Sequence, residues 1–320
     1  MAIDQETVRR SATIKEIPSK AATSSRVLRV ESEYLLPSTY IIESPSALQI
    51  LLEPWMVGAR LANFARDSSV DFIRAAFDLI PEFQEASLSS VTEVVPLAGA
   101  IYYSLAEAFA CVFGETISRC FIGARRHLTP TGWKTDLSYE NFEALSPSPV
   151  ILIGDTIATG GTVESIIETT LSQASDVRAI LVYSIAGGLQ GAIRLKEISD
   201  RIDSPIYTFY SNAIFGVEAN GTDMPWLHPG TIATPKMKDK AVEAYGPELA
   251  RRWCCIWDWG DRAKHPLKHL DELLERSESE LISIENEKTA EVLNRVRDET
   301  TSALKRWKSR LVISEHEPEQ

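Results

Sequence analysis

The chain has 320 residues, of which 44% are apolar and 24% are charged, and its formal net charge at pH 7 is −12. This length and apolar content suit one large α/β domain with additions, or two domains. The negative charge argues against nucleic acid and anionic membranes as partners, although a few local donors are enough to hold a small phosphorylated ligand. No run approaches the roughly 20 apolar residues of a membrane-spanning helix. The N-terminal region lacks an apolar signal segment, and the four cysteines have neither zinc-ligand nor redox spacing, so we expect a cytoplasmic protein with reduced thiols.

The first 45 residues are polar, rich in Ser and Thr and without a sustained period, so we predict an N-terminal tail or arm over residues 1–45. Apolar residues then recur at helical spacing from 46 to 83, and Pro81 ends that helical pattern. Further on, short apolar runs rich in β-branched residues alternate with helical patterns, which predicts a parallel sheet flanked by helices. The expected strands are 92–97, 119–123, 150–154, 179–185 and 205–209. The expected helices between them are 103–113, 162–173 and 190–202.

Two stretches interrupt this alternation. Residues 124–149 hold no helical period and look like an excursion or hairpin over the sheet, while residues 213–250 are irregular and rich in Gly and Pro. We expect the N-terminal helices and residues 210–262 to form a hood over one edge of the α/β domain, which we place at 46–265. Residues 266–320 are charged and mostly helical, and we predict a C-terminal helical extension that docks on the domain or pairs with another chain.

The strongest chemical signal is the run Val150–Thr162 (VILIGDTIATGGT), in which a buried strand delivers Asp155 and a loop then opens a helix. The two glycines between Thr159 and Thr162 let the backbone approach a ligand closely, the two hydroxyls add donors, and the helix N-terminus adds the positive end of its dipole. Such a loop is suited to a phosphate group, and the aspartate is suited to vicinal ribose hydroxyls. An ordinary strand-to-helix turn, with Thr162 as an N-cap only, is the alternative.

This run resembles the phosphoribosyl diphosphate loop of the type I phosphoribosyltransferases, and the chain is most similar to the uracil phosphoribosyltransferases over about residues 50–266. Other segments resemble that subfamily in the same order: Ala65–Ile80, Glu93–Ala108, Cys120–Thr129, Ser184–Leu189, Pro205–Ser211 and Trp257–Arg262. The resemblance implies an α/β fold of the type I class. It implies an enzyme in which a ring nitrogen of uracil or a related heterocycle attacks phosphoribosyl diphosphate and releases pyrophosphate, with Mg²⁺ as cofactor. It also implies a homodimer or a higher homo-oligomer.

The same resemblance assigns roles to particular residues. Asp155 would contact the ribose, Arg126 would reach the diphosphate, and Asp155 and Asp261 are the candidate ligands for Mg²⁺. Arg125 is a second candidate for the diphosphate, although a solvated arginine pair is the usual alternative. The residues expected to bind the 5′-phosphate are Ala158, Thr159, Gly160, Gly161 and Thr162. The residues expected beside the base are Trp257, Asp258, Trp259, Gly260 and Asp261.

Several positions depart from the pattern of that subfamily. Gly154 stands at the first acidic position, and Leu97 and Ala98 occupy the stretch where an arginine is usual. Trp257 and Trp259 replace smaller residues, and their rings would stack on the base, fill its pocket or pack into the core. Without the usual arginine, pyrophosphate depends on backbone N–H groups, Arg125, Arg126 or Arg262. The departures favour an alternative function, in which a catalytically silent protein of this fold binds a nucleotide or phosphoribosyl diphosphate and regulates a partner. The intact TIATGGT loop favours the transferase.

Overall fold

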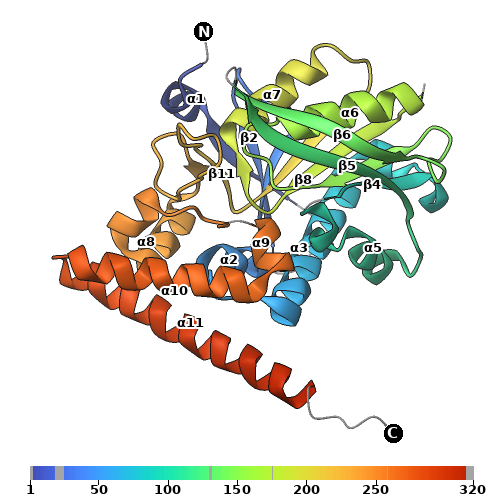
Figure 1. Ribbon diagram of the computed structural model, residues 1–320. Coiled ribbons are helices and arrows are strands. Elements are labelled where there is room, and N and C mark those ends of the chain that lie inside the picture. The colour runs from blue at the N-terminus through green and yellow to red at the C-terminus, as the bar shows by residue number, and fades with distance from the viewer. Residues whose placement is uncertain are drawn as a thin grey trace, which may run out of the picture.

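A nine-stranded sheet runs through the centre of the computed structural model, which describes residues 3–18, 25–97, 99–129, 132–174, 176–257 and 259–314. The strand order is β1-β2-β3-β10-β8-β7-β4-β5-β6 (Figure 1). The strands from β3 to β5 in this order are parallel, and antiparallel pairs close the sheet at both ends. Their bounds are β1 Thr13–Ile17, β2 Arg26–Glu31, β3 Thr39–Glu43, β4 Val91–Pro96, β5 Ser118–Thr129, β6 Gly132–Asn141, β7 Val150–Gly154, β8 Ala179–Ser184 and β10 Ile206–Ser211. A small second sheet, β12-β11-β9, contains β9 Gly187–Gly188, β11 Ala213–Phe215 and β12 Ile232–Ala233.

All five predicted strands are present, as β4, β5, β7, β8 and β10, and they pair in parallel. In β7, Val150 and Leu152 point to one hydrophobic core, whereas Ile151 and Ile153 point to another. This alternation explains why the run is apolar at every position, because both faces of a covered parallel sheet are buried. The predicted excursion over 124–149 contains the long β5–β6 hairpin.

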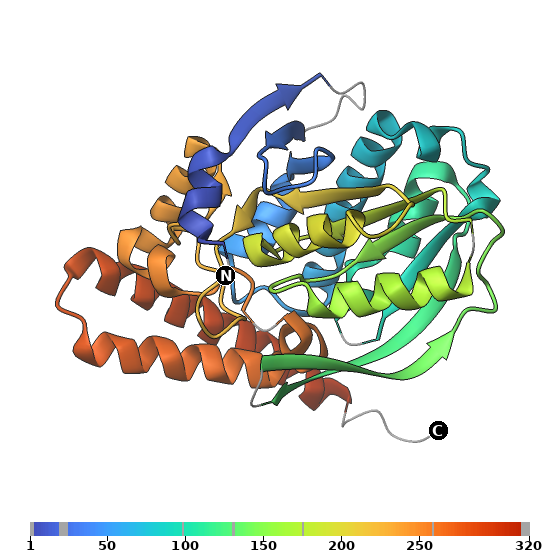
Figure 2. The same ribbon diagram turned by 90° about the horizontal axis from the view of Figure 1, so that it is seen from above.

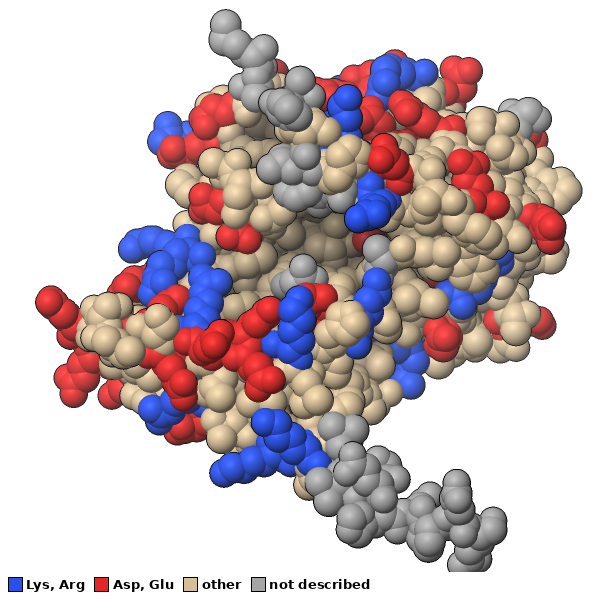
Figure 3. Space-filling view, viewed as in Figure 1, with Lys and Arg blue, Asp and Glu red and all other residues tan. Residues whose placement is uncertain are grey.

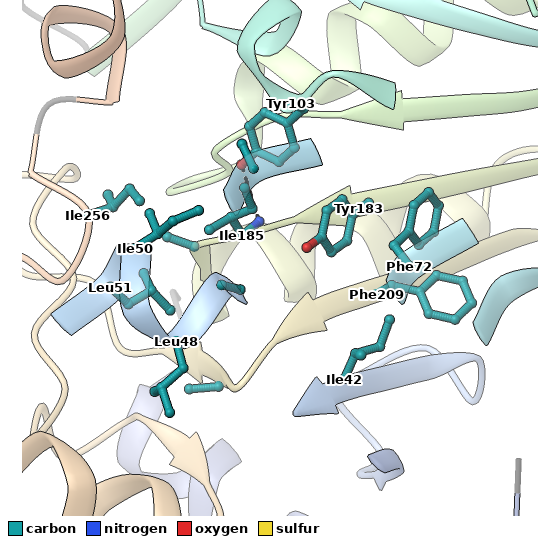
Figure 4. Close-up of a cluster of buried hydrophobic side chains, with 14 of the residues drawn as sticks. Ile42, Leu48, Ile50, Leu51, Phe72, Tyr103, Tyr183, Ile185, Phe209 and Ile256 are labelled. Carbon is teal, nitrogen blue, oxygen red and sulfur yellow. Dashed lines mark hydrogen bonds between the residues drawn. The ribbon is translucent and has the colours of Figure 1, made fainter. Parts of the chain in front are cut away.

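Helices cover both faces of the sheet. The helices α2 Pro45–Leu52, α3 Gly58–Leu79 and α5 Leu105–Phe113 pack on one face, where Phe72 of α3 stacks on Tyr183 with ring centroids 4.6 Å apart (Figure 4). The helices α6 Gly161–Gln173 and α7 Leu189–Ser199 pack on the other face. Short helical turns complete the connections: α4 Pro81–Gln84, η1 Leu88–Ser90 and η2 Ala100–Tyr103. The helix α3 ends before Pro81, as the sequence predicted.

The expectation of a tail over residues 1–45 was wrong for the described part of that segment. It contains α1 Gln5–Ser11 and the strands β1, β2 and β3, and every residue of β3 is buried against β10. These strands are only five or six residues long, which is too short for an alternation of apolar and polar residues to stand out in a polar segment. The strand β3 pairs with β10, which lies far away in the chain, so the residues around β3 give no sign of this pairing.

Residues 213–250 are also more ordered than predicted, because they contain most of helix α8, Pro235–Arg252. Its buried residues Met237, Ala241, Tyr245 and Leu249 recur every four positions. The pair Gly246–Pro247 interrupts the helix, since Gly246 has a φ of 67°. These two residues made the segment resemble a loop in the sequence.

The C-terminal extension forms two antiparallel helices, α10 Pro266–Ser283 and α11 Glu287–Ser314, which follow the short α9 Trp259–Lys264 (Figures 1 and 2). Leu270 of α10 and Leu304 of α11 bury against Val57, and the Trp307 ring lies over Gly58. Of the two alternatives for this extension, the structure therefore shows docking on the α/β domain. None of the described helices is long and apolar enough to cross a membrane.

Glu93 gives the fold a dependence on pH. Its side chain is 2% exposed, and its carboxylate lies 2.8 Å from Arg119 Nε. Burial raises its pKa to about 7, against the opposing effect of Arg119. Because the folded-state pKa is raised, the folded protein binds this proton more tightly than the unfolded chain does. The contribution of Glu93 to stability is therefore full below pH 4.5 and is lost as the pH rises through 7.

Glutamine does not titrate, so Glu93→Gln should keep its stability as the pH rises while the wild type loses some. Between pH 5 and pH 8, we expect the difference in the free energy of unfolding, variant minus wild type, to shift by roughly 2–3 kcal/mol in favour of the variant. Urea denaturation at both pH values measures this difference. A difference between the two proteins that stays constant with pH would contradict the raised pKa.

Candidate functional site

The predicted phosphate loop, Asp155–Thr162, lies where the strand order of the parallel sheet reverses. In chain order the central strands are β4, β5, β7, β8 and β10, whereas in space β5 lies on one side of β4 and β7 on the other. The connections after β4 and β7 lead to helices α5 and α6, which cover opposite faces. Ligands of open α/β sheets bind outside the carboxyl ends of the strands at this reversal. Pro96 ends β4 there, and Asp155 follows β7.

The loop Asp155–Thr162 is shaped by its own backbone. The Asp155 N–H donates to Tyr183 O (3.0 Å), and its Oδ1 accepts from the Thr156 N–H (2.8 Å). Gly160 has a φ of 84°, which a residue with a side chain rarely adopts, and α6 begins at the next residue. A small pocket inside the loop is lined by every residue from Asp155 to Val163. The loop and the N-terminus of α6 therefore form a concave surface of backbone groups, as expected for an anion site.

The segment Ser184–Leu189 and the start of α7 hold this loop from behind. Gly188 N donates to Ile157 O (2.6 Å), and Gly191 N donates to Ala158 O (2.9 Å). A Cβ added at Gly188 would lie 2.6 Å from Ala158 O, so only glycine allows this approach. The two chain segments support each other, and the loop is preorganised.

A cavity of about 320 Å³ opens beside the loop. On the loop side its wall consists of Asp155, Thr156, Ala158 and Thr162. Its other wall includes Trp257, Trp259, Gly260 and Lys264, from and just before α9. The space-filling view shows this face hollowed, with both basic and acidic side chains around the hollow (Figure 3). The structure thus brings the predicted phosphate loop and most of the predicted base segment to one cavity.

The two indoles differ in how much of the cavity wall they form. Trp259 is 4% exposed, donates from Nε1 to Gly99 O (2.9 Å) and meets the Tyr103 ring edge-on at 5.5 Å. Trp257 is only partly buried and packs edge-on against Trp253, with centroids 5.2 Å apart. Trp259 is therefore mainly a core residue with an edge at the cavity, whereas more of Trp257 is accessible.

Gly154 lies close to the side chains of Leu105 and Tyr103. A Cβ added at Gly154 would lie 3.0 Å from Leu105 Cδ1 and 3.1 Å from Tyr103 Cδ1. The Tyr103 hydroxyl is 3.0 Å from Thr156 Oγ1 and accepts from the Ile185 N–H at 3.2 Å (Figure 4). Burial, with the nearby charge of Asp155, raises the pKa of Tyr103, so the hydroxyl stays neutral. The sequence does not single out this residue, because a tyrosine at the start of an apolar helix carries no local signal of function.

Several predicted residues lie elsewhere. The Asp261 carboxylate pairs with Lys268, whose hydrogen bond lowers the pKa of Asp261, and Asp261 is not part of the cavity wall. Arg262 is fully buried and donates to the carbonyls of Ile50, Glu53 and Met56. Its position therefore does not fit the predicted role as a pyrophosphate ligand.

The hairpin residues are only partly described. Arg125 is exposed on β5, opposite Asp136. Arg126 pairs through its backbone with Thr135, whose hydroxyl lies 3.2 Å from that of Thr162, so the hairpin contacts the phosphate loop. The Arg126 side chain and the whole of Asp258 lie outside the described residues, and their predicted roles stay predictions.

The residues around the cavity supply only part of a Mg²⁺ site. Among the described residues of the cavity wall, Asp155 is the one carboxylate. No cluster of three or more His, Cys, Asp or Glu residues that could hold a metal ion occurs in the described part of the chain. Mg²⁺ in phosphate-binding sites is usually held by one or two carboxylates together with the phosphates of the substrate. Asp155 therefore suits the ion only in combination with a diphosphate ligand, and the predicted role of Asp261 is not supported because Lys268 neutralises it.

Comparison with known proteins finds no matching family model and no significant match among curated protein sequences. Among solved structures, the AQ2163 protein of Aquifex aeolicus is 13% identical, with a TM-score of 0.44, and the match covers 57% of this chain and 91% of that one. A hypothetical protein of Neisseria gonorrhoeae with bound ppGpp is 8% identical (TM-score 0.31; 49% and 83% covered). The adenine phosphoribosyltransferase of Thermoanaerobacter pseudethanolicus is 13% identical (TM-score 0.31; 65% and 99% covered). At such TM-scores these likenesses carry no argument about the chemistry of this chain.

Proposed function

We propose that this protein transfers a phosphoribosyl group from phosphoribosyl diphosphate to a ring nitrogen of uracil or a related heterocycle. One observation carries the proposal: a preorganised phosphate loop at the reversal of the strand order opens onto a cavity whose opposite wall presents an indole. The loop suits a 5′-phosphate, the Asp155 carboxylate suits ribose hydroxyls, and an aromatic wall suits a planar base.

The residues of this chain would act mainly by positioning and by electrostatics. The loop from Ala158 to Thr162 would hold the 5′-phosphate, and Asp155 would orient the ribose so that its anomeric carbon faces the base. The departing pyrophosphate needs positive charge. Lys264 is the one basic residue among the described residues of the cavity wall, and Arg126 on the hairpin is a second candidate. Mg²⁺, where it accompanies the diphosphate, would neutralise further negative charge there.

The remaining parts of the proposal follow the sequence resemblance. We place the protein in the cytoplasm as a homodimer or higher homo-oligomer. Trp257 makes the base side of the cavity more aromatic than the sequence pattern of uracil phosphoribosyltransferases implies.

A second function is favoured by Tyr103. Its ring lies against Gly154, where the family pattern carries an acidic residue, so the site has one carboxylate fewer for ribose or metal contacts. A protein so altered can keep the phosphate loop and bind a nucleotide or phosphoribosyl diphosphate without transferring it. It would then regulate a partner according to the bound ligand.

The test is pyrophosphate release from phosphoribosyl diphosphate and Mg²⁺, first with uracil and then with a panel of heterocycles. Release that depends on one acceptor supports the transferase and names the base. Binding of phosphoribosyl diphosphate without release, for every acceptor tried, would replace the transferase with the silent binding protein.

A further inference from the structure

One face of helix α10 is directed at the tryptophans behind the cavity. His269, Arg276 and Glu280 are spaced by seven and four residues, so they lie on the same side of this helix. The Arg276 guanidinium lies over two indoles, with Cζ 5.6 Å from the Trp253 ring centroid and 5.1 Å from that of Trp257. Both distances are within the range of cation–π attraction.

Glu280 holds the arginine in this position. Its carboxylate accepts from Arg276 Nε (3.2 Å), from Trp253 Nε1 (3.0 Å) and from Arg252 (2.7 Å). Burial alone would raise the pKa of Glu280, but these hydrogen bonds outweigh it and lower the pKa below the usual value. The carboxylate is therefore charged at neutral pH, and it orients the Arg276 side chain over the rings.

Trp257 depends on these neighbours. Its backbone is left-handed, with a φ of 60°, a conformation that bulky residues rarely adopt without support from their surroundings. The rings of Trp253 and His269 contact its indole edge-on, with centroids 5.2 Å and 6.1 Å away. Arg276 covers the Trp257 ring from α10, and Trp257 itself forms part of the cavity wall facing the loop Asp155–Thr162. The C-terminal extension thus reaches the cavity through a single layer of side chains.

We propose that Arg276 is a positioning residue that fixes the Trp257 ring as the surface against which the planar ring of a bound ligand packs. The inference rests on the proposed function for the kind of ligand, but not for the position of the indole. It makes the α10–α11 hairpin a structural part of the base side of the site. A ligand that binds through its phosphate alone should not depend on Arg276.

The experiment compares Arg276→Met, which keeps an unbranched apolar stem and removes the charge, with Arg297→Met, a partly exposed arginine of α11 that pairs with Asp298. The probes are ribose 5-phosphate, which lacks a base, and uridine and adenosine 5′-monophosphates, with affinities measured by calorimetry. We expect Arg276→Met to weaken binding of whichever nucleotide binds the wild type by about five- to tenfold, with ribose 5-phosphate changed less than twofold. Arg276→Lys should recover part of the loss, and Arg297→Met should match the wild type.

Equal weakening of the nucleotide and of ribose 5-phosphate, or no change in either, would overturn the positioning role. If none of the three probes binds the wild type, the proposed function fails, and the position of the indole is tested without a ligand. Acrylamide quenching of the Trp257 fluorescence is then obtained by difference, from the wild type minus Trp257→Phe and from Arg276→Met minus the double variant. More quenching in the Arg276→Met background supports the inference, and equal quenching sinks it.

Discussion

Replacing Asp155 with asparagine should lower pyrophosphate release by roughly 100-fold or more, because a charged acceptor for the ribose hydroxyls becomes a neutral one. The amide oxygen of asparagine can still accept from the Thr156 N–H, so the loop should keep its shape. Circular dichroism and the melting temperature check that shape, and steady-state kinetics with the acceptor that the heterocycle panel identifies measures the loss.

The matched control is Asp200→Asn, an exposed carboxylate at the C-terminal end of α7 that pairs with Lys196. It should leave turnover unchanged. Full pyrophosphate release by Asp155→Asn would remove Asp155 from the chemistry. If the wild type shows no release and Asp155→Asn only weakens phosphoribosyl diphosphate binding, the silent binding protein is the better description.

Replacing Arg262 with methionine should lower the free energy of unfolding by about 3–5 kcal/mol, since each buried acceptor left without a donor costs roughly 1–3 kcal/mol. The guanidinium is fully buried, and it donates to Ile50 O (2.9 Å), Glu53 O (2.6 Å) and Met56 O (2.9 Å). These carbonyls lie at and just beyond the C-terminus of α2, where a helix leaves acceptors without partners of its own. Methionine fills similar space but leaves the three carbonyls buried without donors.

Burial lowers the pKa of Arg262 to about 10, so the side chain is still charged at neutral pH, where the measurement is made. Urea denaturation gives the difference, and Arg66→Met, an exposed arginine of α3 beside Asp67, is the control with an expected change within about 0.5 kcal/mol. A loss below 1 kcal/mol for Arg262→Met would mean that water or a rearranged α9 satisfies the carbonyls.

The loop could be predicted from the sequence because the residues that shape it are close together in the chain. A run of β-branched residues, two glycines, two threonines and a following helix pattern are all contained in Val150–Gln173, and the structure has the strand, the turn and the helix there. The same holds for the other central strands, since a strand buried on both faces is apolar at every position. Whether the loop binds a phosphoribosyl group is still a prediction from those residues.

Other features depended on partners far away in the chain. The strand β3 looked like part of a polar tail, because its burial comes from β10, about 170 residues further on. Asp261 was predicted to bind Mg²⁺ and Arg262 was a candidate for pyrophosphate, but Lys268 neutralises Asp261 and the carbonyls around the end of α2 surround Arg262. The departure at Gly154 was visible in the sequence, whereas its close contact with Leu105 and Tyr103 was not.

By itself the sequence predicted the five central strands, the helices between them and a loop suited to a phosphate, because hydrophobic period and glycine placement act within one turn or one strand. Only the tertiary structure decided which side chains share the cavity with that loop. Lys264 and Trp257 line the same cavity as Asp155, and Arg276 of the C-terminal extension lies over the Trp257 ring. The physical reason is that burial and charge pairing depend on contacts between residues distant in the chain, and no local pattern records those contacts.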